Sequence, residues 1–337
     1  MLKVGKLDSD LLKSLIFDKI KYRNEDVKVH PGIGEDCAVI DYGDYDCVMS
    51  TDPITAAVSD IGRLSIHITC NDIASNGVQP LGIMLAVMLP EGTCEEDIAQ
   101  IMRQAAETAS DVGVEIIGGH TEITPAVNQP VIVSTAIGKT LAGSSQSGDN
   151  MTIGDKIMIT KSIGLEGTGI IAADYASELT GVLTNDELTK SISFLDKVSV
   201  VPEGVAAGKV GTHGMHDITE GGVLGAVWEM CQIAGLGAEI YRNHIPMEPE
   251  TDKICRHFGI DPLRLISSGS MLIMVPEDKE DKITQVMKDS NVNISTIGVI
   301  KPLADGVKIT SEKNYQILET VAPPTTDDLY KVVSRTE

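Results

Sequence analysis

The sequence predicts an α+β protein of two domains, and three observations support this prediction. The chain has 337 residues, which exceeds the usual size of a single domain. Strand-like apolar runs and helical patterns occur in both halves, without the strict alternation of a parallel βαβ fold. The segment 141–155 is small and polar, so we expect an N-terminal domain at 1–150 and a C-terminal domain at 151–337.

In the first half, we expect strands at 46–50, 81–89, 114–118 and 130–138. Residues 93–113 predict a helix, because their apolar side chains recur on one helical face: Ile98, Ile101, Met102, Ala105 and Ala109. Thr93 and Glu96 have the spacing of a capping box at its start. Gly113 is a typical residue for its C-terminal end.

The second half predicts a strand, three helices and two later strands. The first strand lies within 156–164, and a helix follows it at 167–179 after a turn that contains glycine. A second helix at 183–198 begins with the capping pair Thr184 and Glu187. We expect the third helix at 221–235 and the late strands at 270–276 and 295–300.

Charge and composition restrict the possible partners. The net charge is −22, which argues against nucleic acid as a partner, but allows an anionic small molecule if metal cations lie between it and the protein. No apolar run approaches the roughly 20 residues that cross a membrane, and we expect a cytoplasmic protein. The six cysteines form no C-x-x-C pair and are expected to be small core residues.

Polar residues collect at the ends of the expected elements in the first half. Asp36 follows a Gly-x-Gly loop, Asp52 follows a strand, and Asp72 lies in a helical pattern after Asn71. His120 and Glu122 follow another strand and a pair of glycines. Each residue alone would suit a cap or a turn. Because Mg²⁺ prefers carboxylates and substrate phosphates as ligands, four such places in one domain favour a shared magnesium site.

A second candidate region lies at 212–226, where Asp217, Thr219 and Glu220 precede two glycines and a helix. Backbone N–H groups at a helix start can hold phosphate, and the acids could hold another cation. His213 and His216 favour turn or supporting roles over a zinc site, because no third ligand is apparent. The sequence contains neither a P-loop nor a dinucleotide-binding glycine motif. The glycine-rich segment 164–169 is explained equally well by a tight turn.

Taken in order, these segments resemble a family that includes aminoimidazole ribonucleotide synthetase, selenophosphate synthetase, thiamine-monophosphate kinase and the hydrogenase maturation protein HypE. The segments are GIGEDCAVI (32–40), STDPIT (50–55), NDIASNGVQPLGIML (71–85), GGHTE (118–122) and MHDITEGG (215–222). The resemblance covers roughly residues 30–275, and the AIR synthase-related, HypE-like branch is the most similar.

The resemblance implies a two-domain PurM-like fold whose N-terminal four-stranded sheets pair in a homodimer, with ATP and Mg²⁺ bound between the domains. It implies metal binding by Asp36, Asp52, Asp72 and Asp217, with Ser50 and Thr51 beside them. It also implies nucleotide contacts by Gly118, Gly119, His120, Thr121, Thr219, Gly221 and Gly222. The shared chemistry is the activation by ATP of an oxygen in a carbonyl, carbamoyl or phosphate group.

The chain also departs from the pattern of the family that it resembles. HypE proteins end in a cysteine that carries a carbamoyl group, whereas this chain ends in DLYKVVSRTE and its last cysteine is Cys255. His120 stands where most members have an acid. We therefore expect an ATP- and Mg²⁺-dependent enzyme whose acceptor is an unknown small molecule or a protein-borne group. The alternatives are a small-molecule kinase of the thiamine-monophosphate type and a non-catalytic, nucleotide-binding maturation partner.

Overall fold

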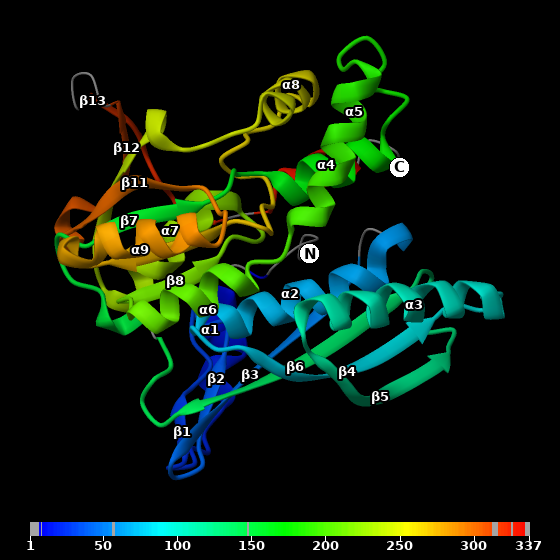
Figure 1. Cartoon of the computed structure of the whole chain (residues 1–337), viewed down its shortest axis with the longest axis horizontal. Helices are drawn as coiled ribbons and strands as arrows, with labels where there is room; N and C mark the ends of the chain where they lie inside the picture. The colour runs from blue at the N-terminus through cyan, green and yellow to red at the C-terminus, as the bar shows by residue number, and fades with distance from the viewer. Residues whose placement is uncertain are drawn as a thin grey trace.

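The computed structural model of the protein describes residues 7, 9–55, 58–146, 148–311, 316–324 and 326–333. Figure 1 shows two sheets, one from each half of the chain, with helices packed against both. This arrangement confirms the predicted mixed fold. The exact domain boundary stays a prediction, although residues 142–155 connect the two sheets. No helix among the described residues is both long and apolar enough to cross a membrane.

The first sheet has six strands in the order β1-β2-β3-β6-β4-β5. Their bounds are Val27–Val29 (β1), Ala38–Asp41 (β2), Tyr45–Ile54 (β3), Pro80–Leu89 (β4), Glu115–Ile123 (β5) and Val131–Leu141 (β6). The four long strands are the expected ones, and β1 and β2 extend the sheet beyond β3. Neighbours are antiparallel except β4 and β5, which are parallel and are connected by α3 (Glu95–Val112).

The predicted start of α3 is wrong by one residue. Cys94, not Thr93, is the N-cap, and its backbone N–H donates to Asp97 Oδ2 at 3.1 Å. The Thr93 hydroxyl donates instead to the Pro90 carbonyl at 2.8 Å, so it closes the preceding turn and cannot cap the helix. The end is confirmed, since Gly113 has a left-handed φ of 77°. The capping pair of Thr184 and Glu187 is also confirmed, at the start of α5 (Asn185–Ile192).

Helix α2 (Ile61–Ser75) joins the two halves of the molecule. It is buried on nearly all sides because the first sheet, α3 and α6 (Val201–Val210) surround it. A Cβ on Gly204 would lie 2.3 Å from the Ala74 carbonyl oxygen, so α6 can approach α2 only with glycine there. Asn71 donates from Nδ2 to the Val198 carbonyl and accepts from the Val200 N–H, both at 2.8 Å. This pair of bonds fixes the second half beside Asp72.

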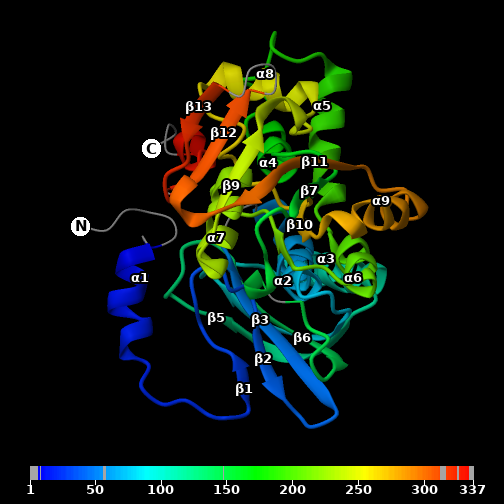
Figure 2. The ribbon, with the colours of Figure 1, turned by 90° about the vertical axis from the view of Figure 1, so that its left-hand side faces the viewer.

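The second sheet has seven strands in the order β13-β12-β9-β11-β7-β10-β8. Their bounds are Lys156–Thr160 (β7), Gly214–Asp217 (β8), Gly237–Tyr241 (β9), Met271–Val275 (β10), Ile294–Lys301 (β11), Val307–Ser311 (β12) and Gln316–Thr320 (β13). The remaining helices are Ser9–Leu15 (α1), Leu165–Asp174 (α4), Gly222–Ala234 (α7), Pro249–Phe258 (α8), Glu280–Asp289 (α9) and Leu329–Val333 (α10). Figure 2 shows α2 and α6 between the two sheets, and the edge strand β8 packs against α2.

One face of the first sheet carries exposed apolar side chains. In β4, Ile83 and Leu85 are buried, whereas Leu81 and Met84 are 59% and 43% exposed. Ile117 of the neighbouring strand is 48% exposed. In Figure 1, α2 and α3 lie on the other side of this sheet. The exposed side chains therefore form an apolar surface, which we call the open face of the first sheet.

Candidate functional site

A cleft of 1150 Å³ lies between the two halves of the chain. Its walls come from the loop before β2, from β3, α2 and α4, from the loop before α7, and from the C-terminal segment 326–333. Among the described lining residues, Lys331 is the single basic one. The acidic lining residues are Glu35, Asp36, Asp52, Asp72, Glu166, Asp174, Glu220 and Asp327. Such a cleft can accept an anion only together with a cation.

The predicted metal carboxylates converge around Asp72. This side chain is only 6% exposed, and Ser50 Oγ donates to its Oδ2 at 2.6 Å. Burial raises the pKa of Asp72 well above its usual value, and the nearby carboxylates of Asp52, Asp217 and Asp36 raise it further. The structure thus brings together all four predicted carboxylates and Ser50. We call Asp36, Asp52, Asp72 and Asp217 the metal-site carboxylates, because a divalent cation would relieve the repulsion between them.

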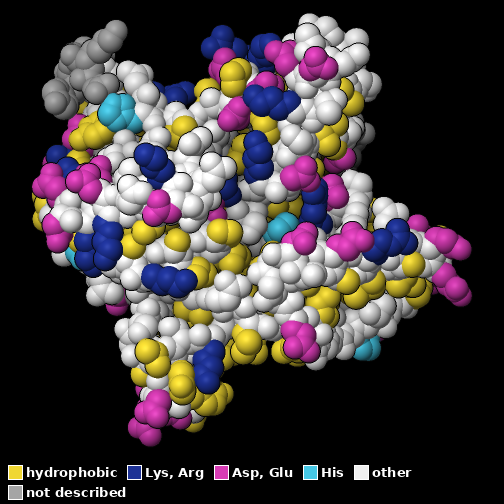
Figure 3. Space-filling view, viewed as in Figure 1, with side chains coloured by type: hydrophobic (Ala, Val, Ile, Leu, Met, Phe, Trp, Pro, Cys, Tyr) yellow, Lys and Arg dark blue, Asp and Glu magenta, His cyan; other side chains and the backbone are white. Residues whose placement is uncertain are grey.

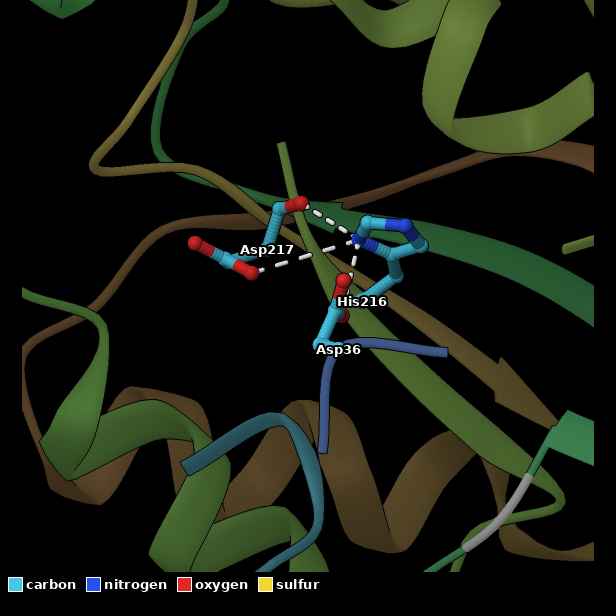
Figure 4. A group of neighbouring side chains, drawn as sticks. All are labelled: Asp36, His216 and Asp217. Carbon is cyan, nitrogen blue, oxygen red and sulfur yellow. Dashed lines mark hydrogen bonds and ion pairs between the residues drawn. The ribbon is translucent and has the colours of Figure 1, made fainter. Parts of the chain in front are cut away.

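His216 lies within this group, as Figure 4 shows. Its Nδ1 donates to the Asp217 carbonyl at 2.6 Å and lies 3.3 Å from Asp36 Oδ2. Its Nε2 lies 3.4 Å from Glu229 Oε2 on α7. Burial alone would lower the pKa of His216, but the carboxylates of Asp36, Glu229 and Asp217 outweigh it and raise the pKa to about 10. His216 therefore acts as an internal counter-charge for these acids.

The supporting role of His216 stays a prediction. His213 has a different partner, Asp155, whose Oδ2 lies 2.7 Å from its Nδ1. An atom of each of Asp36, His216 and Asp217 lies within 4.8 Å of the others, which is a spacing that one metal ion could bridge. Glu229 was not predicted from the sequence. The available signal was a single acid in the otherwise apolar segment 221–235.

Other predicted site residues lie outside this group. The Thr51 hydroxyl lies 3.0 Å from the Ser134 carbonyl and 3.0 Å from Thr135 Oγ1 on β6. Because neighbouring side chains of a strand point to opposite faces, the Thr51 side chain lies on the other face from Ser50 and Asp52, although Thr51 also lines the cleft. Gly118, Gly119, His120 and Thr121 are exposed on the edge strand β5, and none of them lines the cleft of its own chain. His120 lies 3.3 Å from Glu122.

The start of α7 holds a carboxylate of the protein itself. Gly221 N–H donates to Asp327 Oδ2 at 2.7 Å, and Gly222 N–H donates to the Thr219 carbonyl at 3.2 Å. A helix N-terminus favours an anion, and Asp327 occupies that position here. Thr219 lines the cleft nearby. A phosphate could bind the Gly221 N–H only in place of Asp327, which the sequence did not reveal as a site residue.

A second acidic group surrounds Glu166, near the start of α4. Burial raises the pKa of Glu166 to about 7; hydrogen bonds to Ser268 lower it, and the charges of Asp327 and Glu220 raise it. The Tyr330 hydroxyl donates to Glu220 Oε1 at 3.2 Å. From the sequence alone, a tight turn explained the glycine-rich segment around Glu166 as well as a ligand-binding loop did. A single acid in that apolar segment was the signal that could have identified Glu166.

We expect Glu166→Gln to stabilise the metal-free protein, and the gain to grow as the pH rises from about 4.5 to 7. In the folded state the carboxyl keeps its proton up to a pKa of about 7, whereas the usual value is 4.5. Within that window folding takes up a proton, so wild type loses stability as the pH rises. Across the whole window, the change in the free energy of unfolding that comes from Glu166 is about 3 kcal/mol. Urea unfolding of both proteins at pH 5 and pH 8 measures it.

The matched control for this measurement is Glu178→Gln, which neutralises an exposed glutamate shortly after α4. Its free energy of unfolding should follow that of wild type at both pH values. Equal pH dependence in wild type and Glu166→Gln would show that the Glu166 carboxyl titrates normally.

Two family models match the chain. The N-terminal domain of AIR synthase related protein matches residues 34–140, and the C-terminal domain of the same family matches residues 152–308. A protein of Methanocaldococcus jannaschii, provisionally named as a hydrogenase expression/formation protein, is 28% identical over 328 residues, which cover 94% of each chain. The carbamoyl dehydratase HypE of Rhodobacter capsulatus is 29% identical over 227 residues, which cover 67% of this chain and 64% of that protein.

Solved structures share the fold. A HypE–HypF complex has a TM-score of 0.75 at 24% identity, covering 93% of this chain and 99% of the other. A HypE in complex with ATP has a TM-score of 0.70 at 21% identity, covering 95% and 97%. A ThiL complexed with AMPPCP and TMP has a TM-score of 0.70 at 18% identity, covering 89% and 91%.

Proposed function

This chain belongs to the AIR synthase-related protein family and has its two-domain PurM-like fold, and from that premise we propose an ATP- and Mg²⁺-dependent enzyme. The enzyme would use ATP to activate an oxygen of a carbonyl, carbamoyl or phosphate substrate. The observation that carries the proposal is the convergence of Asp36, Asp52, Asp72 and Asp217 at one end of the cleft between the halves. The existence of a HypE structure with bound ATP supports it.

The residues of this chain have distinct roles in that site. The metal-site carboxylates would hold the cation, which supplies positive charge to the ATP phosphates. Ser50 orients Asp72 through its 2.6 Å hydrogen bond. Asn71 holds the second half of the chain against α2, so that Asp217 stays beside Asp72. His216 balances the carboxylates on the β8 side.

The acceptor would be a separate molecule or a group on another protein. Cys37, Cys70, Cys231 and Cys255 are buried. Burial raises the pKa of Cys255 to about 12, which keeps its thiol unreactive at neutral pH. None of the six cysteines, all of which the structure describes, lines the cleft. The HypE–HypF complex supports the alternative of a protein-borne acceptor.

The position of all six cysteines away from the cleft also favours a second candidate function. If no cysteine of this chain receives the activated group, a free small molecule could receive the γ-phosphate, as in a kinase of the thiamine-monophosphate type. The shared fold of the ThiL complex is compatible with this reading. A third possibility, from the sequence, is a non-catalytic nucleotide-binding partner.

Purified protein with Mg²⁺, ATP and pooled carbonyl, carbamoyl and phosphate metabolites tests the three functions. We expect ADP release that depends on one metabolite, with a product whose mass reports loss of water or gain of phosphate. Loss of water indicates a dehydratase, and gain of phosphate indicates a kinase. The mass of the protein chain should not change, and a cyanated cysteine would contradict the proposed acceptor. ATP binding without any turnover would indicate the non-catalytic, nucleotide-binding function.

We further propose that the protein is a homodimer paired through the open face of the first sheet. Apolar surface of this kind is stabilised by burial against a second copy. In such a dimer, β5 of one copy lies next to the other copy, which is how residues 118–121 would reach a nucleotide. These residues do not line the cleft of their own chain.

Met84→Glu is expected to convert the dimer to a monomer at micromolar concentration. The substitution places a charge on an apolar side chain that is 43% exposed in one chain and would be buried in the dimer. Light scattering gives the molar mass. Ile153→Glu, at an exposed apolar residue of the connecting segment, is the control and should leave the dimer intact. A monomeric wild type would show the proposed pairing to be wrong.

A further inference from the structure

The segment 197–200 lies at the junction of the two halves, and two side chains hold it. Asn71 of α2 accepts from one backbone group of this segment and donates to another, both at 2.8 Å. Lys161 binds two further groups, because its Nζ donates to the carbonyls of Lys197 at 3.1 Å and Ser199 at 2.6 Å. Asn71 belongs to the first half of the chain, and Lys161 follows β7 in the second. The segment is therefore clamped between the two side chains.

Lys161 also neutralises Glu203 of α6. Its Nζ lies 2.6 Å from Glu203 Oε1, in an ion pair that lacks hydrogen-bond geometry. Glu203 is 1% exposed, and a buried carboxylate that loses its counter-charge destabilises the folded state. The side chain of Lys161 thus has two tasks, which are to balance this charge and to hold the segment 197–200. The two tasks can be separated by substitution, because only the first involves Glu203.

The backbone of Lys161 adopts an uncommon conformation. Its φ is 53°, and among the residues that the structure describes only Asn291 shares a positive φ without being glycine. A left-handed φ brings the Cβ of an ordinary residue close to the backbone and costs free energy. Such a cost persists where the surrounding structure requires it, often at functional positions. At Lys161, the left-handed backbone comes with a side chain that reaches α6 and the segment 197–200.

Lys161 lies outside the cleft but connects two of its walls. It is not one of the described residues that line the cleft. The chain runs from Lys161 into α4, which forms one wall, whereas Asn71 directly precedes Asp72 on α2. The contact of Lys161 with the segment that Asn71 binds therefore links α4 to the helix that carries Asp72.

The ammonium group of Lys161 also acts on α2 directly. His67 lies one turn before Asn71 and is 8% exposed. Burial, together with the charges of Arg63 and Lys161, lowers the pKa of His67 to about 4. Figure 3 shows basic side chains where the two halves of the molecule meet, although the net charge of the chain is −22. Arg63 and Lys161, and not His67, thus supply the positive charge beside this part of α2 at neutral pH.

We propose that Lys161 is a positioning residue of the enzyme: it holds the segment 197–200 against Asn71 and so keeps the two halves of the cleft at the spacing that Mg·ATP needs. The inference rests on the proposed function, which places a cation between carboxylates of both halves. Asp72 comes from α2 and Asp217 from β8, so a small displacement of one half would pull ligand oxygens away from the cation. Lys161 would act through Asn71 and would touch neither the nucleotide nor the metal.

Two variants separate positioning from charge neutralisation. Glu203→Gln removes the buried carboxylate but leaves both hydrogen bonds of Lys161 to the segment 197–200. The double variant Lys161→Met with Glu203→Gln removes those hydrogen bonds as well, and it leaves no buried charge without a partner. Calorimetry with Mg²⁺ and a non-hydrolysable ATP analogue should give wild-type affinity for Glu203→Gln and at least fivefold lower affinity for the double variant. Equal affinity in the two variants would overturn the inference.

A melting curve establishes that both variants are folded. Lys209→Gln removes an exposed positive charge from α6 and should bind the analogue like wild type, which excludes a general effect of charge. Lys161→Gly with Glu203→Gln keeps the test decisive if the methionine variant does not fold, because glycine adopts a left-handed φ without strain. The same loss of affinity is expected from it, and wild-type affinity would contradict the positioning role.

Hydrogen exchange separates this inference from the proposed function. The Val200 N–H, which donates to Asn71 Oδ1 at 2.8 Å, should exchange at least tenfold faster in the double variant than in Glu203→Gln. An equal exchange rate in these two variants would overturn the inference. If wild type itself does not bind the analogue, the proposed function is wrong. Faster exchange would then still show that Lys161 positions the segment that Asn71 binds.

Discussion

Asp52→Asn is expected to lower the affinity for Mg·ATP tenfold or more while leaving the fold nearly intact. Asp52 lies at the end of β3, lines the cleft and is one of the charges that raise the pKa of Asp72. Asparagine keeps the size and much of the hydrogen bonding but removes one hard, charged ligand oxygen. A tenfold loss corresponds to about 1.4 kcal/mol. Without the cation, ATP would meet an acidic cleft.

Calorimetric titration of ATP, with Mg²⁺ and with EDTA, measures this effect in wild type and in the variant. Asp278→Asn removes an exposed charge outside the cleft and serves as the control, for which we expect wild-type affinity. A melting curve establishes that Asp52→Asn is folded. Equal ATP binding in EDTA would contradict the prediction, and so would wild-type affinity of Asp52→Asn for Mg·ATP. Either result would mean that these acids only cap or end strands and helices and do not bind the cation.

Asp72→Asn is expected to stabilise the metal-free protein and to remove its response to Mg²⁺. Asp72 is 6% exposed among Asp36, Asp52 and Asp217, so its charge destabilises the folded state when no cation is present. Asparagine can still accept the hydrogen bond from Ser50. We expect a gain of about 1 kcal/mol, or about 2–4 °C in melting temperature. Mg²⁺ should raise the melting temperature of wild type by binding the folded state, but not that of the variant.

Thermal unfolding with and without Mg²⁺ checks this prediction. Ser50→Ala is the matched variant, because it removes the hydrogen bond to Asp72 and keeps all four charges. It should not gain stability in the absence of metal, and it should keep a response to Mg²⁺. An Asp72→Asn protein that Mg²⁺ stabilises as strongly as wild type would show that the cation binds elsewhere.

The carboxylates that gather around Asp72 could be singled out from the sequence because they follow local rules. Asp52 ends an apolar run, Asp72 lies in a helical pattern and Asp217 precedes a glycine pair, and each could be recognised within a short window. The long strands of the first sheet were predicted for the same reason, whereas β8, β9, β12 and β13 of the second sheet and the helices α6, α8 and α9 were not predicted. The start of α3 was not, because Thr93 competes with Cys94 and the outcome depends on the turn at Pro90.

The Glu166 end could not be predicted in the same way. Asp327 reaches Gly221 across 106 positions of the sequence, and Tyr330 reaches Glu220 across 110. Nothing in a short window indicates such contacts. The same reason explains why Gly221 was predicted to hold a phosphate although it holds Asp327. Position in the sheet likewise decides that residues 118–121 lie away from the cleft of their own chain.

The C-terminal segment 326–333 has a consequence for how proteins of this architecture diverge. It supplies Asp327 and Tyr330 to one end of the cleft, whereas the metal-site carboxylates come from earlier elements of the chain. Changes confined to this segment would therefore alter one end of the cleft and leave the carboxylates around Asp72 as they are. For laboratory evolution of the proposed enzyme, this short segment is a compact library target, because it can be varied without changing the carboxylates around Asp72.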